Sequence, residues 1–218
     1  ITPKTKAIVI TYPSNPLGAV LDRADGEALA KVIEKHNIMV ISDEVYEKII
    51  FDGREHFSLA QIESIKEKVL VVNSLSRTYT MTGWRLGYCM ADTPIRDRMQ
   101  IFHQHAVVSA PSYVQPACVQ ALKTDVSGVR ELFRRRRDDV YRRLTDMGLG
   151  VQKPEGAFYM FINIEKYGMA SEAFCTKMLQ EGLVGLIPGV YFGTEGYMRL
   201  SYCYSDEDLK EGLDRIEK

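Results

Sequence analysis

The chain has 218 residues, enough for one large domain or two small ones and for a hydrophobic core that needs no disulfide or metal. Its 28 Lys and Arg side chains nearly balance 29 Asp and Glu, so the net charge of -1 gives no general attraction to nucleic acid or an anionic membrane. No apolar run approaches the roughly 18 residues that a membrane span needs. The composition therefore favours a globular cytoplasmic protein that binds neither nucleic acid nor membrane.

Two further features concern the context of the chain. It begins at Ile1 rather than Met, with a polar stretch unlike a signal peptide, so we interpret it as a piece of a longer protein. Its cysteines are scattered without a CxxC pair, which favours reduced thiols with structural roles; they are Cys89, Cys118, Cys175 and Cys203.

Strand and helix patterns alternate in the first part of the chain. Residues 7–11 form a β-branched run that predicts a buried strand. Helical spacing in residues 25–36 leads to a second apolar strand at residues 38–42, and helical spacing in residues 59–65 leads to a third at residues 69–72. Strands that are apolar on both faces and alternate with helices predict an α/β fold with a mostly parallel sheet flanked by helices.

A fourth apolar run, at residues 86–90, follows a loop too short for a crossover helix, so antiparallel pairing is predicted for it. The pattern then becomes helical over residues 94–146, where the Arg-dense stretch at residues 131–143 indicates a long, solvated connecting helix. We place a domain boundary near residue 124, giving a first domain of residues 1–124 and a smaller α/β domain of residues 125–218. The second domain is predicted to contain a strand at 158–163, a helix at 171–181, strands at 183–187 and 198–202, and a helix at 206–217.

Two other features of the helical region do not predict sites. His103 and His105 are two residues apart, hence on different faces of a helix, so they do not predict a metal pair. The side chains of residues 134–137 point around the helix and are followed by acidic residues, which disfavours a nucleic-acid surface. No metal site is predicted.

Polar residues follow the predicted strands. In open α/β sheets, ligands bind beyond the carboxyl ends of the strands, so these residues should converge on one crevice. Hydroxyls and guanidiniums suit a phosphate, and a carboxylate there suits a ring nitrogen that must stay protonated. The polar residues are Asn15, Asp43, Tyr46, Ser74, Ser76, Arg77 and Arg85.

Six ordered segments resemble the class I/II aminotransferases, which are fold-type I enzymes that use pyridoxal 5'-phosphate (PLP). The segments are YPSNPLG at 12–18, SDEVY at 42–46, SLSRTYTMTGWRLGY at 74–88, PEGAFY at 154–159, PGVYFG at 188–193 and GYMRLS at 196–201. The resemblance implies that the first domain is the remainder of a large PLP-binding domain and the second is the small C-terminal domain.

The resemblance also implies roles for the PLP ring. Asp43 matches the carboxylate that keeps the ring nitrogen protonated. Asn15 and Tyr46 match the donors to the ring's 3-oxygen, and Tyr46 with Asp43 is assigned to the catalytic group.

A second set of residues matches the binders of anionic groups. Ser74, Ser76 and Arg85 match the phosphate grip, and Arg199 matches the residue that binds the substrate's α-carboxylate, with Asn15 beside it.

One position departs from the family. Arg77 stands where the family has the lysine that forms the Schiff base with PLP. A guanidinium stays protonated near neutral pH and delocalises its lone pairs, so it can neither bond covalently to PLP nor act as a general base. Smaller departures are Tyr12 for the usual Asn and Leu17 for the usual Thr.

The resemblance implies a PLP-dependent aminotransferase of amino-acid metabolism and biosynthesis that moves an amino group from an L-amino acid to a 2-oxo acid as a cytoplasmic homodimer. In the family, the segment before Ile1 supplies sheet strands, a glycine loop, a stacking aromatic and part of the dimer interface. Together with Arg77, its absence predicts that this chain is inactive and binds PLP weakly or not at all. Two alternatives remain: a PLP-dependent carbon-sulfur lyase, and a non-catalytic relative with a binding or regulatory role.

Overall fold

The computed structural model describes residues 1–218 and divides into two compact units. Unit 1 comprises Ile1–Pro13 and Val20–Ser127, and unit 2 comprises Ser14–Ala19 and Gly128–Lys218. The predicted domain boundary lies after residue 124, three residues before the end of unit 1 at Ser127. The prediction kept residues 14–19 in the first domain, whereas here they group with unit 2. None of the helices is both long and apolar enough to cross a lipid bilayer.

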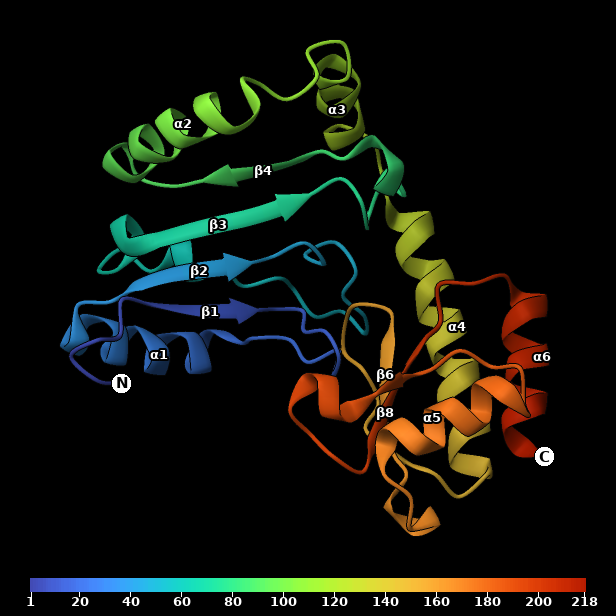
Figure 1. Ribbon diagram of the computed structural model, residues 1–218. Coiled ribbons are helices and arrows are strands. Elements are labelled where there is room, and N and C mark those ends of the chain that lie inside the picture. Colours follow the sequence, from blue (N-terminus) through green and yellow to red (C-terminus); the bar gives the residue numbers. More distant parts are fainter. The chain divides into compact units, whose positions relative to one another are not determined.

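The sheet of unit 1 has four strands in the order β1-β2-β3-β4 (Figure 1). The strands are β1 (Ala7–Thr11), β2 (Met39–Asp43), β3 (Val69–Ser74) and β4 (Gly87–Met90). The first three are parallel and β4 pairs antiparallel with β3. The predicted mostly parallel α/β sheet is therefore confirmed, as is its antiparallel fourth strand.

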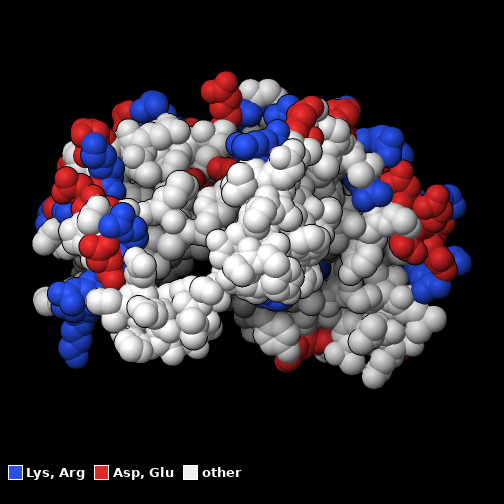
Figure 2. All heavy atoms as spheres, turned by 90° about the horizontal axis from the view of Figure 1, so that it is seen from above, with Lys and Arg blue, Asp and Glu red and all other residues white.

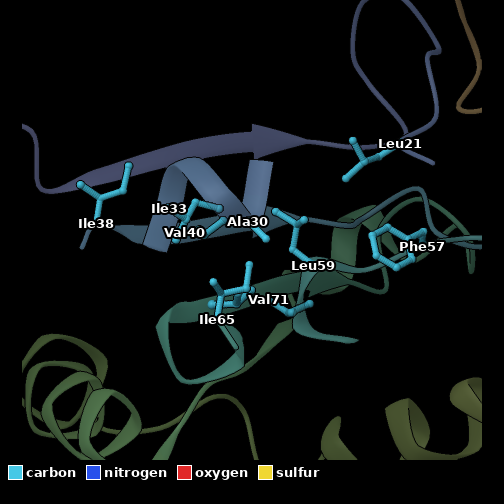
Figure 3. Close-up of a cluster of buried hydrophobic side chains, with 10 residues drawn as sticks. Leu21, Ala30, Ile33, Ile38, Val40, Phe57, Leu59, Ile65 and Val71 are labelled. Carbon is cyan, nitrogen blue, oxygen red and sulfur yellow. The ribbon is translucent and has the colours of Figure 1, made fainter. Parts of the chain in front are cut away.

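Helix α1 (Arg23–His36) packs on one face of this sheet. It begins where the Asp22 side chain accepts a hydrogen bond from the Asp25 amide, and it ends at Asn37 in the left-handed conformation. Ala30 and Ile33 of α1 meet side chains of β2 and β3 in the core cluster of Figure 3. Each fully buried Val, Leu, Ile or Phe side chain of such a cluster contributes roughly 1.5–3 kcal/mol to the free energy of unfolding. The cluster consists of Leu21, Ala30, Ile33, Ile38, Val40, Phe57, Leu59, Ile65, Val69 and Val71.

The helix predicted from the spacing in residues 59–65 is wrong. Two short 3-10 helices occupy this region, η1 (Leu59–Gln61) and η2 (Lys66–Lys68), because the backbone at Ile62 is extended and breaks the helical path. Leu59 and Ile65 are still buried, so the spacing correctly marked core residues while misassigning the backbone.

Helices α2 (Thr93–Val107) and α3 (Gln115–Leu122) complete unit 1, together with the 3-10 helix η3 (Thr82–Trp84). No residue of α2 is buried, and large apolar side chains such as Phe102 and Tyr113 are exposed on and after it. Figure 2 looks onto the side of the molecule that lies at the top of Figure 1 and shows a broad area without charged side chains.

Unit 2 contains a second four-stranded sheet, in the order β5-β6-β8-β7, with antiparallel pairing throughout. Its strands are β5 (Gly150–Val151), β6 (Tyr159–Asn163), β7 (Ile187–Pro188) and β8 (Tyr197–Ser201). Its helices are α4 (Ser127–Asp146), α5 (Ser171–Gln180) and α6 (Asp206–Glu217), with the 3-10 helices η4 (Glu165–Tyr167) and η5 (Gly189–Phe192).

The strand predicted at residues 183–187 is largely wrong. Only Ile187 and Pro188 pair with β8, since Leu183 adopts a positive φ of 55° that no strand residue uses. The other strands and both helices predicted in residues 158–217 form close to their expected positions.

Helix α4 also differs from the predicted solvated helix. Arg137 is fully buried, where its guanidinium donates to the Pro154 carbonyl at 3.0 Å and pairs with Asp138 at 2.8 Å. Arg135 and Arg136 pair with Asp206 at the start of α6. The Arg-dense stretch thus joins α4 to the rest of unit 2.

The segment Ser14–Ala19 belongs to unit 2 because of backbone contacts at Gly18. The amides of Glu155 and Gly156 both donate to the Gly18 carbonyl, at 2.9 and 2.8 Å. A Cβ atom on Gly18 would lie 2.5 Å from the Pro154 Cβ, so only glycine permits this approach.

Candidate functional site

Asp43 ends β2 at the carboxyl edge of the unit 1 sheet. Its neighbours Ser42 and Glu44 are buried on the core side of the strand, so the alternation of a strand turns Asp43 to the opposite, more open face. The Asp43 Oδ1 accepts a hydrogen bond from the Val45 amide at 3.2 Å. Burial raises the pKa of the Asp43 carboxyl, and the Val45 amide and the positive charge of Arg77 partly oppose the rise. This carboxylate is suited to bind a cationic group.

Glu44 anchors the turn after Asp43, and sequence reasoning missed its role. Its carboxylate is buried and accepts hydrogen bonds from Ser42 at 2.9 Å and Ser58 at 2.6 Å, and it contacts His56 Nε2 at 2.7 Å. The carboxylate of Glu47 lies within 4.8 Å of the Glu44 and His56 ligand atoms. Because the hydroxyls and the imidazole already satisfy Glu44, we interpret this cluster as a network that holds the β2 turn.

Tyrosines surround the same turn. Tyr46 is buried. Burial, and secondarily the negative charge of Glu47, raises the pKa of the Tyr88 phenol to about 12 and also raises the pKa of Tyr79. Both phenols are therefore neutral hydrogen-bonding groups at physiological pH.

The loop from Ser74 to Arg85 begins at the end of β3. The Ser74 hydroxyl donates to the Leu86 carbonyl at 3.3 Å and accepts from the Ser76 amide at 3.0 Å, so it is engaged within the loop. The Thr82 hydroxyl donates to the Ser76 carbonyl at 2.9 Å, and Arg85 donates to the Thr82 carbonyl at 3.0 Å. The loop is thus closed by its own bonds, with the Ser76 hydroxyl and the rest of the Arg85 guanidinium left to bind other groups.

Arg77 is half-buried in this loop; its carbonyl accepts a hydrogen bond from the Thr80 amide at 3.4 Å, and its guanidinium forms no hydrogen bond or ion pair with the chain. Its charge acts on Asp43, as the pKa of that carboxyl reflects. The six predicted residues of unit 1 therefore lie at the carboxyl ends of β2 and β3 and in the loop after β3; they are Asp43, Tyr46, Ser74, Ser76, Arg77 and Arg85.

The other two predicted residues, Asn15 and Arg199, lie together in unit 2. Arg199 Nη1 donates to the Asn15 Oδ1 at 2.8 Å. The guanidinium lies 4.5 Å from the centre of the Tyr159 ring and 5.1 Å from that of Phe192, and its Nε is buried without a partner. A planar cation in contact with two rings, with unused donors, is suited to bind a carboxylate.

The fold and these groups define the class of protein to which the chain belongs. Residues 1–216 match the sequence model of the family described as aminotransferase class I and II. The chain belongs to this family, whose members are PLP-dependent enzymes.

Several relatives match the whole chain. Aromatic-amino-acid aminotransferase 2 of Thermococcus litoralis is 39% identical and aspartate aminotransferase of Pyrococcus abyssi is 41% identical, and the match covers 58% of each relative. The crystal structure of an aromatic aminotransferase from Pyrococcus horikoshii OT3 superposes on the whole chain with a TM-score of 0.96 at 41% identity, over 60% of its own length. The chain spans less than two thirds of these relatives.

The residues of unit 1 fit PLP except at one position. The Ser76 and Arg85 donors suit a phosphate, and the half-buried Asp43 suits a protonated ring nitrogen. Arg77 does not fit covalent attachment, because a guanidinium is not a nucleophile at neutral pH. The site fits a phosphate-bearing pyridine ligand held without a covalent bond.

Proposed function

We propose that this chain carries the cofactor-binding and carboxylate-binding residues of an aminotransferase that moves an amino group from an L-amino acid to a 2-oxo acid. The observation that carries the proposal is the half-buried Asp43 carboxylate at the end of β2, within electrostatic reach of the loop that bears Ser76 and Arg77. When bound, PLP supplies an electron sink for substrate carbanions. Asp43 would hold a proton on the ring nitrogen, Ser76 and Arg85 would hold the phosphate, and Arg199 would orient the substrate carboxylate.

Arg77 favours a second candidate function, a non-catalytic relative that binds ligands without turnover. With Arg77 in place, the chain has no amine at this position to attach PLP or to move a proton from the substrate. We propose that the chain with Arg77 is inactive and binds PLP weakly. Homodimeric assembly and a cytoplasmic location also stay predictions.

The two functions differ in their response to Arg77→Lys. If the locus is an aminotransferase site, PLP at high concentration should attach to position 77 of this variant, because the restored amine would lie near Asp43 and the Ser76 hydroxyl. Borohydride reduction followed by peptide mass spectrometry measures the attachment. Labelling at position 77 should exceed that at Lys68 and Lys123 and should fall when Asp43→Asn is added. Equal labelling at all three positions would contradict the aminotransferase proposal.

A further inference from the structure

One face of the unit 2 sheet carries both a guanidinium and apolar rings. Phe161 of β6 pairs with Arg199 of β8, and Tyr197 lies two residues before Arg199 on the same strand. Paired residues and alternate residues of a strand share a face, so the three side chains lie on one side of the sheet. The opposite face carries the buried Met198 and Leu200 of β8.

Arg199 has donors to spare on this face. One nitrogen bonds Asn15, while Nε is buried without an acceptor and the remaining nitrogen has no hydrogen bond in the chain. Buried donors normally have partners, and a carboxylate supplies two acceptors in the geometry that a guanidinium needs. The Tyr159 and Phe192 rings both contact the guanidinium and restrict it, so a carboxylate would bind to a group already held in place.

An apolar groove begins beside Arg199. Phe192 contacts the guanidinium with its ring 5.1 Å away and also lines a hollow of about 520 Å³. Inside this groove the Phe161 ring stacks on Tyr197 with centroids 4.9 Å apart and meets Phe192 edge to face at 5.9 Å. No charged side chain lines the groove, which is formed by Pro16, Leu17, Gly150, Val151, Gln152, Phe161, Asn163, Phe192, Thr194 and Tyr197.

A second hollow is also lined by Arg199, but its lining includes Asp208 and a Glu211–Arg215 ion pair. The Asp208 carboxylate accepts a hydrogen bond from the Ser205 hydroxyl but forms no ion pair, so its negative charge disfavours an anionic ligand in that hollow. Of the two hollows beside Arg199, the groove that contains Phe161, Phe192 and Tyr197 is the one suited to the part of the ligand beyond its carboxylate.

We propose that this groove selects the ligand's side chain, so that Arg199 and the groove together bind amino and oxo acids with aromatic or long aliphatic side chains. The inference rests on the proposed role of Arg199 as the carboxylate binder. An acidic side chain would lose its hydration in the groove without meeting a cation, whereas an apolar side chain would cover the exposed Leu17 and the partly exposed Phe192 and Tyr197.

The 218-residue chain can be titrated with 3-phenylpropanoate, acetate and succinate while its ¹H–¹⁵N spectrum is recorded. The phenyl compound should bind about tenfold to hundredfold more tightly than acetate, because its ring is removed from water, and succinate should bind no better than acetate. Leu17→Ser should weaken the phenyl compound about threefold or more and leave acetate unchanged. Leu179→Ser, at a similarly exposed leucine on α5, is the matched control and should change neither affinity.

The two layers of the inference fail in different ways. Arg199→Lys keeps the charge but loses the planar fork, so it should weaken all three carboxylates; carboxylates that bind Arg199→Lys unchanged would overturn the role of Arg199 itself. If Arg199→Lys weakens them all, but succinate binds as tightly as 3-phenylpropanoate or Leu17→Ser leaves the preference intact, the groove has no part in selection. Absence of binding by every carboxylate would overturn both layers.

Discussion

At the scale of single residues, Asp43 is a candidate binding residue whose partly buried carboxylate lowers the stability of the folded chain. Its neighbour Glu44 is fully supplied with hydrogen bonds, whereas Asp43 receives a single bond from the Val45 amide. Desolvation without full compensation makes the ionised carboxylate unfavourable in the folded chain. The same deficit makes Asp43 receptive to a cationic partner.

This deficit predicts a specific pH dependence. Because the pKa of Asp43 is raised above its ordinary value of 3.8, the folded chain holds its proton at pH values where the unfolded chain has lost it. The contribution of Asp43 to the free energy of unfolding should therefore fall as pH rises from about 4 through the folded pKa, and Asp43→Asn should remove this contribution and leave the variant more stable than the parent chain at pH 7. Urea unfolding at a series of pH values measures the difference between the two chains.

Asp206→Asn provides a control with the opposite sign. The Arg136 hydrogen bond, with Arg135, lowers the pKa of Asp206, so its contribution is present above its unfolded pKa and is lost as pH falls through the folded one. The two variants should diverge from the parent chain in opposite directions at pH 7. A less stable Asp43→Asn variant at pH 7 would contradict the account of Asp43.

Other residues also had roles that their sequence pattern did not reveal. Arg137 sits in a run of four arginines, and nothing in that run distinguishes the one that is buried against the Pro154 carbonyl from those that pair at the surface. The difference arises from tertiary packing of α4, which places one side of the helix inward. Asn15 and Asp43 were found because they follow predicted strands, and Arg199 because the segment around it resembles a family; their site roles stay predictions.

At the scale of elements, the segment Ser14–Ala19 depends on glycine. Gly18 adopts a φ of 69° and its carbonyl accepts two amides from residues 155 and 156. The SNPLG motif predicts a turn, but only the long-range contacts with Pro154 determine which unit the turn joins. The segment matters to the site because it carries Asn15 and Leu17.

Gly18→Ala should therefore destabilise unit 2 by about 2 kcal/mol or more, since a methyl group would combine a strained positive φ with a clash against Pro154. Gly53→Ala is the matched control: Gly53 has a φ of 73° but nothing within 4 Å of the added Cβ, so only the strain of about 1 kcal/mol applies. Thermal unfolding followed by circular dichroism compares the two. Equal losses would mean that the contact with Pro154 has no energetic consequence.

At the scale of the whole molecule, the pattern of apolar residues predicted the positions of most helices and strands. The apolar runs of β2 and β3 correctly predicted strands that contribute to the core against α1. The run at residues 7–11 also forms a strand, but the prediction that it is buried is wrong: β1 pairs only with β2, none of its residues is buried and Val9 is 66% exposed. The predictions for residues 59–65 and 183–187 were wrong because a few apolar residues at suitable spacing are compatible with several backbone conformations. The extended backbone of Ile62 interrupts the predicted helix, and the positive φ of Leu183 interrupts the predicted strand. The uncovered surface of α2 could not be predicted, because its mixture of apolar and polar residues would equally suit a helix packed on a core.

That surface predicts a property of the chain in solution. Phe102, Val108 and Tyr113 are 82%, 78% and 85% exposed, and such apolar side chains close together in sequence exceed the scattered exposure usual for a soluble protein. The chain should therefore enhance the fluorescence of 8-anilinonaphthalene-1-sulfonate at neutral pH, and Phe102→Ser combined with Tyr113→Ser should remove roughly half of the enhancement or more.

Leu179→Ser combined with Leu183→Ser is the matched control, since these leucines of unit 2 are 57% and 67% exposed but lie outside this surface. It should leave the dye signal close to that of the parent chain. If both double variants lose the same amount, the dye reports scattered exposure. A loss confined to Phe102→Ser with Tyr113→Ser would locate the dye-binding apolar surface at α2 and the segment that follows it. A polypeptide that packs on unit 1 would gain most free energy there, because apolar area is removed from water.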